Sequence, residues 1–297
     1  MEWKLLSSGR DYGLHTCSVK KVRLGERKIK TITWAIMLAL GLTGCSGIDS
    51  DQHGPAADAH EAHWGYEGEQ APDQWAILNP EFALCGDGTE QSPIDLTSAQ
   101  SIGDPGLERR LGETVLTAAQ RAQVMDIVDN GHTIQVTSDV PMSLQRGDTV
   151  YELVQFHFHS PSEHTLDGKY APLEAHFVHK SADGELVAVG ILVEVGEHNV
   201  ILEPILAALP DREGGKRHLE GLDLDLSQLR PLPKRYYQYR GSLTTPPCSE
   251  GVEWIVYAEK REVSAEQMVA IVSQLHNNYR PVQPLGERTL GLVSVAN

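Results

Sequence analysis

The 297-residue chain has few basic residues: 25 lysines and arginines stand against 41 aspartates and glutamates, which gives a formal net charge of −16. Residues 1–44 contain eight of the basic residues and three of the acidic ones, so the remainder carries 17 basic against 38 acidic side chains, or −21. A surface of that charge repels phosphate backbones, which argues against a nucleic acid partner. A neutral small substrate is compatible with it.

The start of the chain lacks an apolar run long enough to cross a bilayer as a helix, since the run 32–42 is too short. A basic stretch precedes this run, and Leu-Thr-Gly-Cys at 42–45 follows it, which is the pattern of a secretion signal. The ending resembles a bacterial lipobox, which implies cleavage before Cys45, a lipid on its sulfur and attachment to a membrane. An ordinary signal peptide is the alternative.

The segment after this signal has neither apolar periodicity nor bulky side chains. Residues 46–60 are small and polar, so they predict a flexible tether. We therefore expect a signal peptide at 1–44, a tether at 45–60 and one folded domain at 61–297 of an exported protein, either periplasmic or held at the outer membrane.

Cysteine is scarce. Of four cysteines, Cys17 and Cys45 belong to the leader, which leaves Cys85 and Cys248 in the folded domain. An even pair in an oxidising compartment predicts one disulfide that joins distant parts of the chain. Two free thiols are the alternative.

Helical periodicity is confined to 200–209 and 264–277, and the second segment opens with Ser264 and, three residues later, Gln267, a capping box. Internal repeats are absent. Short apolar runs broken by turn residues predict strands at 124–128, 133–137, 143–144, 150–159, 173–180, 186–195 and 254–262. The sequence thus predicts a mostly β (α+β) single domain with short peripheral helices.

Two of the predicted strands alternate apolar and polar side chains. In QFHFH at 155–159 both phenylalanines face one way, whereas Gln155, His157 and His159 face the other. In the second strand His176 shares a face with Glu174. Because Asp-Gly at 167–168 is a turn signal between them, the strands could pair antiparallel and bring the three histidines onto one face.

Three neutral imidazoles that converge on one point hold Zn²⁺ and leave its fourth tetrahedral position open for water, as in catalytic zinc sites. Gln155 and Glu174 lie on the same faces and can accept hydrogen bonds from the ring N–H groups that do not bind metal. Ordinary core histidines are the alternative, but burying several bare imidazoles is costly. We keep that alternative for His164 and His179.

A second metal interpretation takes His157, His159 and Glu163 as part of a cupin motif, with Glu163 as a ligand. The protein would then be an iron or manganese oxygenase or a sugar-binding barrel. The glycines of that motif are displaced or missing, since Tyr151 stands at the first position and Gly168 comes early. The cupin interpretation is therefore weaker.

From about His63 to Arg288 the chain resembles the α-class carbonic anhydrases. The matching blocks, in the family's order, are HWGYEG at 63–68, QSPIDL at 91–96, NGHTIQV at 130–136, QFHFHSPSEHTLDGK at 155–169, EAHFVH at 174–179, AVGILVEVG at 188–196, YRGSLTTPPCSEGVEWIV at 239–256 and RPVQPLGER at 280–288. The resemblance implies one domain built on a large central, mainly antiparallel twisted sheet, with the metal in a conical cleft.

The resemblance also assigns roles to single residues. His157, His159 and His176 match the zinc ligands, and Thr244 matches the residue that donates its hydroxyl proton to Glu163 and so must accept a hydrogen bond from metal-bound hydroxide. The other matches are the proton shuttle His132 with its polar neighbours Tyr66, Asn130 and Gln135; the apolar substrate wall Val178, Ala188, Leu243, Val252 and Trp254; a contact near the metal from Thr245; the bridge of Cys85 and Cys248; and cis peptide bonds at Ser92-Pro93 and Pro246-Pro247. Ala188 and Gln135 are conservative departures that bear on rate.

The activity that the resemblance implies is the reversible hydration of CO₂ to bicarbonate and a proton, through attack by zinc-bound hydroxide and a histidine that carries the proton away. We expect a zinc-dependent carbonic anhydrase, a carbon-oxygen lyase, acting outside the cytoplasm; a homodimer is left open. One competing function is a non-catalytic binding module on the same fold, against which the intact ligands, Thr244 and Glu163 argue. Another is periplasmic zinc storage, favoured by His53, His60 and His63, although incidental histidines in a linker fit better.

Overall fold

The computed structural model of the chain describes residues 63–98, 100–101, 114–116, 121–140, 143–230 and 233–294. The predictions for the signal peptide, for Cys45 and for His53 and His60 in the tether lie outside the described residues. No helix within the described ranges has both the length and the apolar character needed to cross a membrane.

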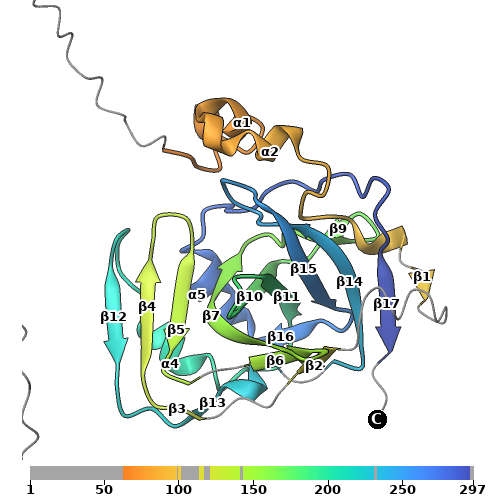
Figure 1. Cartoon of the computed structure of the whole chain (residues 1–297). Coiled ribbons are helices and arrows are strands. Elements are labelled where there is room, and N and C mark those ends of the chain that lie inside the picture. The colour runs from red at the N-terminus through yellow and green to blue at the C-terminus, as the bar shows by residue number, and fades with distance from the viewer. Residues whose placement is uncertain are drawn as a thin grey trace, which may run out of the picture. The chain divides into compact units, whose positions relative to one another are not determined.

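A mixed sheet forms the body of the structure, and 13 strands of the described residues join it (Figure 1). Its main path runs in the order β1-β17-β14-β15-β11-β10-β7-β5-β4-β12, and the pairs are antiparallel except β1/β17, β11/β15 and β11/β16. The strands are β1 (Gln100–Ser101), β2 (Thr114–Leu116), β4 (Met125–Asp129), β5 (Ile134–Ser138), β6 (Ser143–Arg146), β7 (Thr149–His159), β10 (Leu173–Ser181), β11 (Leu186–Val195), β12 (Lys216–Leu219), β14 (Arg235–Ser242), β15 (Glu250–Tyr257), β16 (Arg261–Val263) and β17 (Gly291–Ser294).

Short elements surround this sheet, so the expected fold class is confirmed. Among the described residues, β8 (Thr165–Leu166) and β9 (Lys169–Tyr170) form a short hairpin, and β3 (Arg121–Ala122) pairs antiparallel with the distant β13 (Leu224–Asp225). The helices are η1 (Gly68–Gln70), α1 (Trp75–Leu78), η2 (Pro80–Phe82), α2 (Leu84–Asp87), η3 (Leu96–Ser98), α4 (Glu203–Ala207), η4 (Leu226–Gln228) and α5 (Ala265–Val272).

The strand predictions are confirmed to within a few residues for β4, β5, β6, β7, β10 and β11. The strand predicted at 254–262 is wrong in its extent, because β15 and β16 are separate strands with residues 258–260 between them. Strand β14 was not predicted from the sequence. Its buried face includes Gln238, which donates a hydrogen bond of 2.7 Å to Glu253, so the strand lacks a simple apolar alternation.

The capping box of α5 is confirmed, since the Ser264 side chain accepts from the Gln267 backbone and the Gln267 side chain accepts from Ser264 N. The helix ends at Val272 rather than at Asn277, where φ is +57° and a right-handed helix cannot continue. The other helix, α4, is likewise shorter than predicted and spans only Glu203–Ala207.

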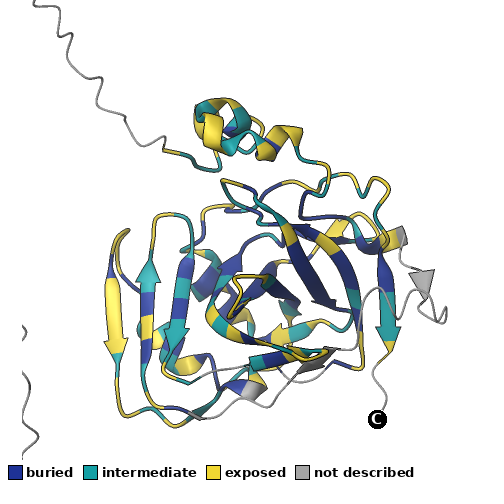
Figure 2. Ribbon diagram, viewed as in Figure 1, coloured by how far each residue is buried: buried dark blue, intermediate teal, exposed yellow. Residues whose placement is uncertain are grey.

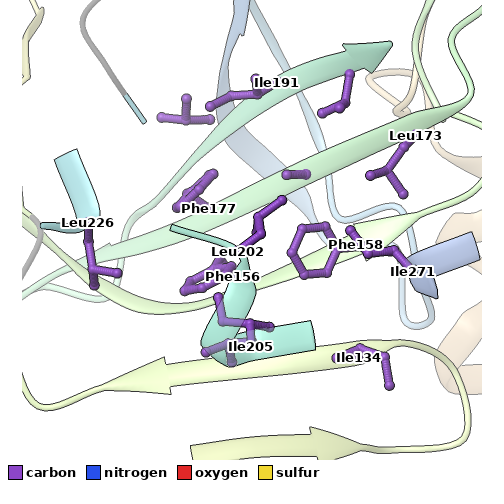
Figure 3. Close-up of a cluster of buried hydrophobic side chains, with 14 of the residues drawn as sticks. Ile134, Phe156, Phe158, Leu173, Phe177, Ile191, Leu202, Ile205, Leu226 and Ile271 are labelled. Atoms are coloured by element: carbon purple, nitrogen blue, oxygen red, sulfur yellow. The ribbon is translucent and has the colours of Figure 1, made fainter. Parts of the chain in front are cut away.

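The main hydrophobic core lies on one face of the sheet, where Phe156, Phe158 and Phe177 pack under Ile205 of α4 and Ile271 of α5 (Figure 3). The Phe156 and Phe177 rings stack with centroids 5.1 Å apart. The central strands are accordingly the most buried part of the ribbon (Figure 2). As the alternation along QFHFH predicts, the phenylalanines face this core and leave the opposite face of β7 to the histidines.

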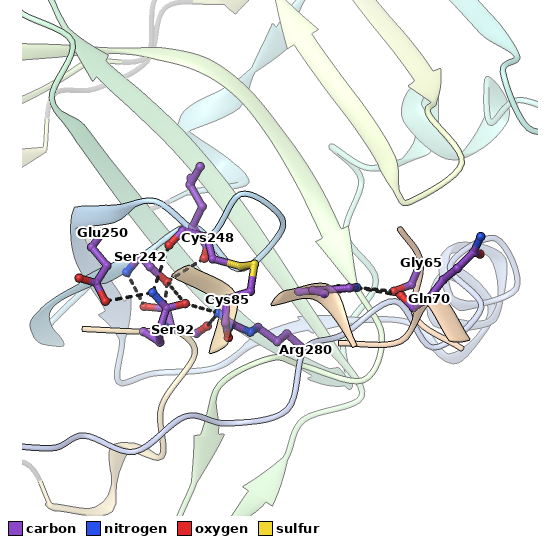
Figure 4. Close-up of a disulfide and its surroundings, with 11 residues drawn as sticks. Gly65, Gln70, Cys85, Ser92, Ser242, Cys248, Glu250 and Arg280 are labelled. Atoms are coloured by element: carbon purple, nitrogen blue, oxygen red, sulfur yellow. Dashed lines mark hydrogen bonds between the residues drawn. A yellow bond between two sulfur atoms is a disulfide. The ribbon is translucent and has the colours of Figure 1, made fainter. Parts of the chain in front are cut away.

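The predicted disulfide joins Cys85 of α2 to Cys248 in the loop before β15, across 163 residues (Figure 4). Peptide bonds Ser92-Pro93 and Pro246-Pro247 are cis, as expected from the resemblance, and Ser160-Pro161 is a third cis bond that we did not expect.

Candidate metal centre and active site

Strands β7 and β10 pair antiparallel, as the sequence predicts, and the register places His157 directly opposite His176. His159 lies on the same face two residues further along β7, and its ring centroid is 4.9 Å from that of His157 and 4.6 Å from that of His176. One potential ligand atom from each of the three rings lies within 4.8 Å of the others. The three imidazoles therefore converge on one point.

Each of these rings has a partner for the nitrogen that points away from that point. Nδ1 of His157 lies 2.8 Å from Oε1 of Gln155, and Nδ1 of His159 lies 2.6 Å from the carbonyl oxygen of Asn278. Nε2 of His176 lies 3.0 Å from Oε1 of Glu174, an ionic contact that lacks the alignment of a good hydrogen bond. Gln155 and Glu174 therefore stand where we expected them, and the nitrogens left to converge are Nε2 of His157, Nε2 of His159 and Nδ1 of His176.

Burial shifts the pKa values of these rings. It lowers the pKa of His157 well below its ordinary value, with the neighbouring rings acting in the same direction, and it lowers the pKa of His159 as well. Both rings are therefore neutral at pH 7, as a metal ligand must be. At His176 burial acts downward too, but the Glu174 carboxylate outweighs it and raises the pKa.

Glu174 also contacts His164, the histidine that we interpreted as an ordinary core residue. Nδ1 of His164 lies 2.8 Å from Oε1 of Glu174, and its Nε2 lies 2.7 Å from the hydroxyl of Tyr239. The backbone N–H groups of Glu163 and His164 both donate to Oε2 of Glu174 at 2.9 Å. Burial raises the pKa of Glu174, but His164 and His176 outweigh it and hold that pKa well below its usual range. His164 is thus part of the polar network behind the centre.

Glu163 is fully buried beside the histidines. Its Oε1 accepts a 2.8 Å hydrogen bond from the Arg280 backbone N–H, while its Oε2 lies 3.6 Å from Nε2 of His159 and 3.8 Å from Nδ1 of His176. Within the described part of the chain Oε2 has no hydrogen-bond partner, so the hydrogen bond expected from Thr244 is not formed in this structure. Thr244 is itself buried.

The loop that carries Thr244 is held at both ends. The Leu243 N–H donates to the Ser249 carbonyl at 3.0 Å, and the Cys248 N–H donates to the Thr245 carbonyl at 2.9 Å. Since Cys248 is bonded to Cys85, the disulfide fixes this loop to α2.

His132 lies in a cavity of 530 Å³ that adjoins the centre. Asn278 lines the same cavity, and its carbonyl accepts from His159. The His132 ring stacks on Trp64 with centroids 3.7 Å apart and an interplanar angle of 8°. Burial and the neighbouring His63 lower the pKa of His132, and Glu213 opposes them.

The polar neighbours predicted for His132 occupy three different places. Oδ1 of Asn130 accepts from the His132 N–H at 3.0 Å and so holds the turn before β5. Tyr66 lines the same cavity, and its burial, with Glu163 second, raises its pKa well above the ordinary value. Gln135 lies on β5 directly opposite His157.

Most residues of the predicted apolar wall pack together. Ala188, Val252 and Trp254 belong to one buried cluster, and Leu243 packs against it. The Trp254 ring lies 4.8 Å from that of His176, which places the cluster beside the centre. Val178 lies opposite Ala188 in the sheet but outside that cluster, and Thr245 is partly buried in the neighbouring loop.

The sequence reasoning missed Asn278, Arg280 and Trp64 as parts of this site. The contact of Asn278 with His159 uses a backbone carbonyl 119 residues away, for which side-chain patterns carry no signal. Arg280 and Trp64 fall inside the matching blocks RPVQPLGER and HWGYEG, which was the available signal.

Comparison with known proteins agrees with the geometry. The family model described as eukaryotic-type carbonic anhydrase matches residues 70–293. A carbonic anhydrase of Nostoc sp. is 39% identical over 232 residues, which are 78% of this chain and 86% of that protein, and one of Neisseria gonorrhoeae is 36% identical over 258 residues, 86% of this chain and 95% of that protein.

Among solved structures, the α-carbonic anhydrase of Thermovibrio ammonificans, determined in complex with the inhibitor sulfanilamide, is 40% identical. It superposes with a TM-score of 0.67 over 77% of this chain and 99% of that one. A fold built on one large sheet, a histidine triad that could hold a metal and a match over most of the length agree with one another, and the chain therefore belongs to the α, or eukaryotic-type, carbonic anhydrase family.

Proposed function

We propose that this carbonic anhydrase uses zinc at His157, His159 and His176 to interconvert CO₂ with bicarbonate and a proton. One observation supports the proposal most directly. In each of the three rings one nitrogen contacts a neighbouring acceptor, and the other nitrogen faces a point that the three rings share. Three nitrogen donors with no fourth ligand grouped with them among the described residues fit a catalytic zinc site. The two domain cysteines do not compete as ligands, since they are bonded to each other.

The donor set suits the chemistry, because neutral imidazoles leave a divalent ion its full charge, whereas thiolates would offset it. When bound, zinc acts as a Lewis acid that lowers the pKa of water from about 15.7 to about 7. The partners Gln155, Asn278 and Glu174 hold the rings in orientation and so pre-organise the donors.

Glu163 and Thr244 are proposed to orient the reacting oxygen. A buried carboxylate oxygen without a partner among the described residues is costly, and a threonine hydroxyl that donates to it would offset this. If the Thr244 hydroxyl donates its proton to Glu163, its oxygen can only accept a hydrogen bond from the reacting oxygen. That hydrogen bond would orient the reacting oxygen so that a lone pair faces the substrate.

The cluster of Ala188, Val252 and Trp254, with Leu243 against it, is proposed to hold CO₂, which is neutral and apolar and needs no charged partner. Val178 and Thr245 are assigned to the borders of the same wall. The face lies beside His176, so a substrate held there is near the reacting centre.

His132 is proposed to carry the proton from the cavity to buffer, since an imidazole titrates near neutral pH. Tyr66, Asn130 and Gln135 are proposed to assist this transfer as polar neighbours; Tyr66 lines the cavity, Asn130 holds the turn of His132 and Gln135 lies opposite His157. His132→Ala should turn over more slowly in dilute buffer and recover when imidazole is added. A full rate without imidazole would remove His132 from the mechanism.

Stopped-flow measurement of CO₂ hydration, with metal analysis of the same sample, tests the whole proposal. We expect one zinc per chain and hydration that is lost when a chelator removes the metal and returns with zinc. Activity that persists in the metal-free protein, or zinc-loaded protein without activity, would refute it. More than one zinc per chain would favour storage instead.

For the segments outside the described residues, we propose export, lipidation of Cys45 and a periplasmic or outer-membrane location. The disulfide is the structural support, since such bonds persist mainly in oxidising compartments. Mass spectrometry of the protein from a membrane fraction tests lipidation, and an intact leader or an unmodified Cys45 would count against it. Light scattering of the purified protein would decide between a monomer and a homodimer.

A further inference from the structure

The turn that presents His132 is clamped to a second loop that bears charge. The Gly214 N–H donates to the Asp129 carbonyl at 2.9 Å, and the Asp129 N–H donates to the Gly215 carbonyl at 3.0 Å. These bonds fix the residue just before Gly214, which is Glu213, against the turn. Both Glu213 and His132 line the 530 Å³ cavity.

The Glu213 carboxylate packs on Gly131, the neighbour of His132. A Cβ atom at position 131 would lie 2.6 Å from Oε1 of Glu213, so the carboxylate occupies the space that the glycine leaves open. The φ of Gly131 is +83°, which also favours glycine. The contact is thus built into the turn by its backbone.

A second titratable group lies near His132. The His63 ring centroid is 6.0 Å from that of His132, and Trp64 stacks on the His132 ring. His132 therefore shares its cavity with a carboxylate and an imidazole from two separate segments. The other titratable groups that line the cavity are Tyr66 and Glu67 of the N-terminal segment, Asp129 beside the turn, Asp211 and Arg212 of the Glu213 loop, and His276 after α5.

We propose that Glu213 and His63 are positioning residues of the proton-transfer step: Glu213 stabilises the protonated form of His132, and His63 destabilises it. The proposal rests on the proposed role of His132. An anion beside an imidazole favours the charged ring, and a second imidazole disfavours it. The balance lets His132 accept a proton from the cavity and still release it to buffer.

Burial is the largest cause of the lowered pKa of His132; the charges act in the directions that the geometry requires, because His63 lowers this pKa further and Glu213 raises it. The cavity is open to solvent, which screens both charges. We therefore expect each neighbour to move the pKa of His132 by roughly half a pH unit.

NMR titration of the His132 ring in the zinc-loaded protein tests the electrostatic part without relying on activity. Glu213→Gln should lower the pKa of His132 by roughly half a unit, and His63→Gln should raise it by a similar amount. Glu67→Gln is the matched control, since Glu67 lines the same cavity but is not among the charges that act on His132; the pKa of His132 should stay unchanged in it. An unmoved pKa in Glu213→Gln, or shifts of the same sign in both variants, would overturn the proposal.

Kinetics in dilute buffer tests the functional part. Glu213→Gln makes His132 a poorer proton acceptor, so kcat should fall about twofold, while kcat/KM, which covers the steps before regeneration, should stay unchanged. In the His132→Ala background Glu213→Gln should have no effect on kcat, whereas a purely structural role would lower kcat there as well. A wild-type protein without hydration activity would sink the proposed function, and the NMR shifts would still decide the electrostatic claim.

Discussion

Each histidine at the candidate centre uses one ring nitrogen to hold its orientation and leaves the other free. The anchors differ in kind: a side-chain amide for His157, a backbone carbonyl for His159 and a carboxylate for His176. Because a neutral ring has one donor and one acceptor nitrogen, an acceptor anchor makes the free nitrogen a lone-pair donor for a metal. The anchors therefore hold the direction of the rings before any ion binds.

His157→Ala removes one of three donors and should lower the zinc content after dialysis from one per chain to nearly none, with loss of hydration. Gln155→Ala is a milder comparison, because it keeps the His157 ring and removes only the amide that orients it. The zinc affinity of this variant should fall about 10- to 100-fold. Competition with a chelator measures both. Full zinc retention by His157→Ala would remove this residue from the ligand set.

Thr244→Ala should keep its zinc and lose activity by about 100-fold, because the reacting oxygen loses its orientation. Thr244→Ser retains the hydroxyl and should recover most of the rate. Stopped-flow rates and metal content on the same samples give the comparison. Equal rates for the alanine variant and the wild type would exclude Thr244 from the mechanism.

At the scale of elements, the centre depends on segments that approach one another from distant parts of the chain. The Arg280 guanidinium is almost fully buried and donates to the carbonyls of Cys85 and Ser92 and to Oε1 of Gln91 (Figure 4). The Arg280 backbone N–H holds Glu163. One residue thus joins the disulfide region to the carboxylate beside the histidines.

Arg280→Gln should lower the free energy of unfolding by roughly 3 kcal/mol, because buried carbonyls are left without donors. Arg288→Gln is the matched control: Arg288 also donates to three carbonyls, of Leu285, Arg240 and Pro284, but it is partly exposed, so water can replace it. Urea denaturation compares the two variants. Equal losses would show that burial of the guanidinium does not matter.

The elements that the sequence predicts best are those whose side chains alternate strictly. Strand β7 follows the period of two from Phe156 to His159, so its two faces and its antiparallel pairing with β10 could be predicted, although its register could not. Where a polar residue faces inward, as Gln238 does in β14, the pattern fails. The end of α5 was misplaced because the turn residues 273–277 that follow it, with positive φ at His276 and Asn277, keep a helix-like composition.

For the candidate site, prediction worked wherever a side chain carries the contact. The pairing of His157 with Gln155 and the approach of Glu174 to His176 follow from the faces of two strands. Contacts made by backbone groups, such as the Asn278 carbonyl on His159, could not be predicted, because any residue supplies a carbonyl and only the tertiary fold places it.

At the scale of the whole molecule, one sheet separates a polar centre from an apolar core, and His179 lies on the core side. It is fully buried, and burial, with the Arg230 charge second, lowers its pKa to about 3. In an unfolded chain this ring would take up a proton below the ordinary imidazole pKa of 6.5, whereas the folded chain protonates it only near 3. Stability from this ring is therefore complete above pH 6.5 and is lost as the pH falls from 6.5 toward 3.

In His179→Leu the free energy of unfolding should therefore fall less as the pH drops from 6.5 toward 3. The loss that this histidine causes, up to about 5 kcal/mol over that range, should be absent. Urea midpoints measured at intervals between pH 7 and pH 4 test this. His218→Gln is the comparison. Because His218 is exposed, this substitution should still leave a steep fall in stability as the pH drops. An unchanged slope in His179→Leu would mean that this histidine is not what limits acid tolerance.

The hydrogen bonds of Arg280 to Gln91, Ser92 and Cys85 span 188 to 195 residues. During synthesis, the pocket can close only after nearly the whole polypeptide has emerged. A fragment that stops short of position 280 would lack both the guanidinium that bonds the disulfide region and the backbone N–H that holds Glu163. Truncated forms are thus expected to lack a complete active site.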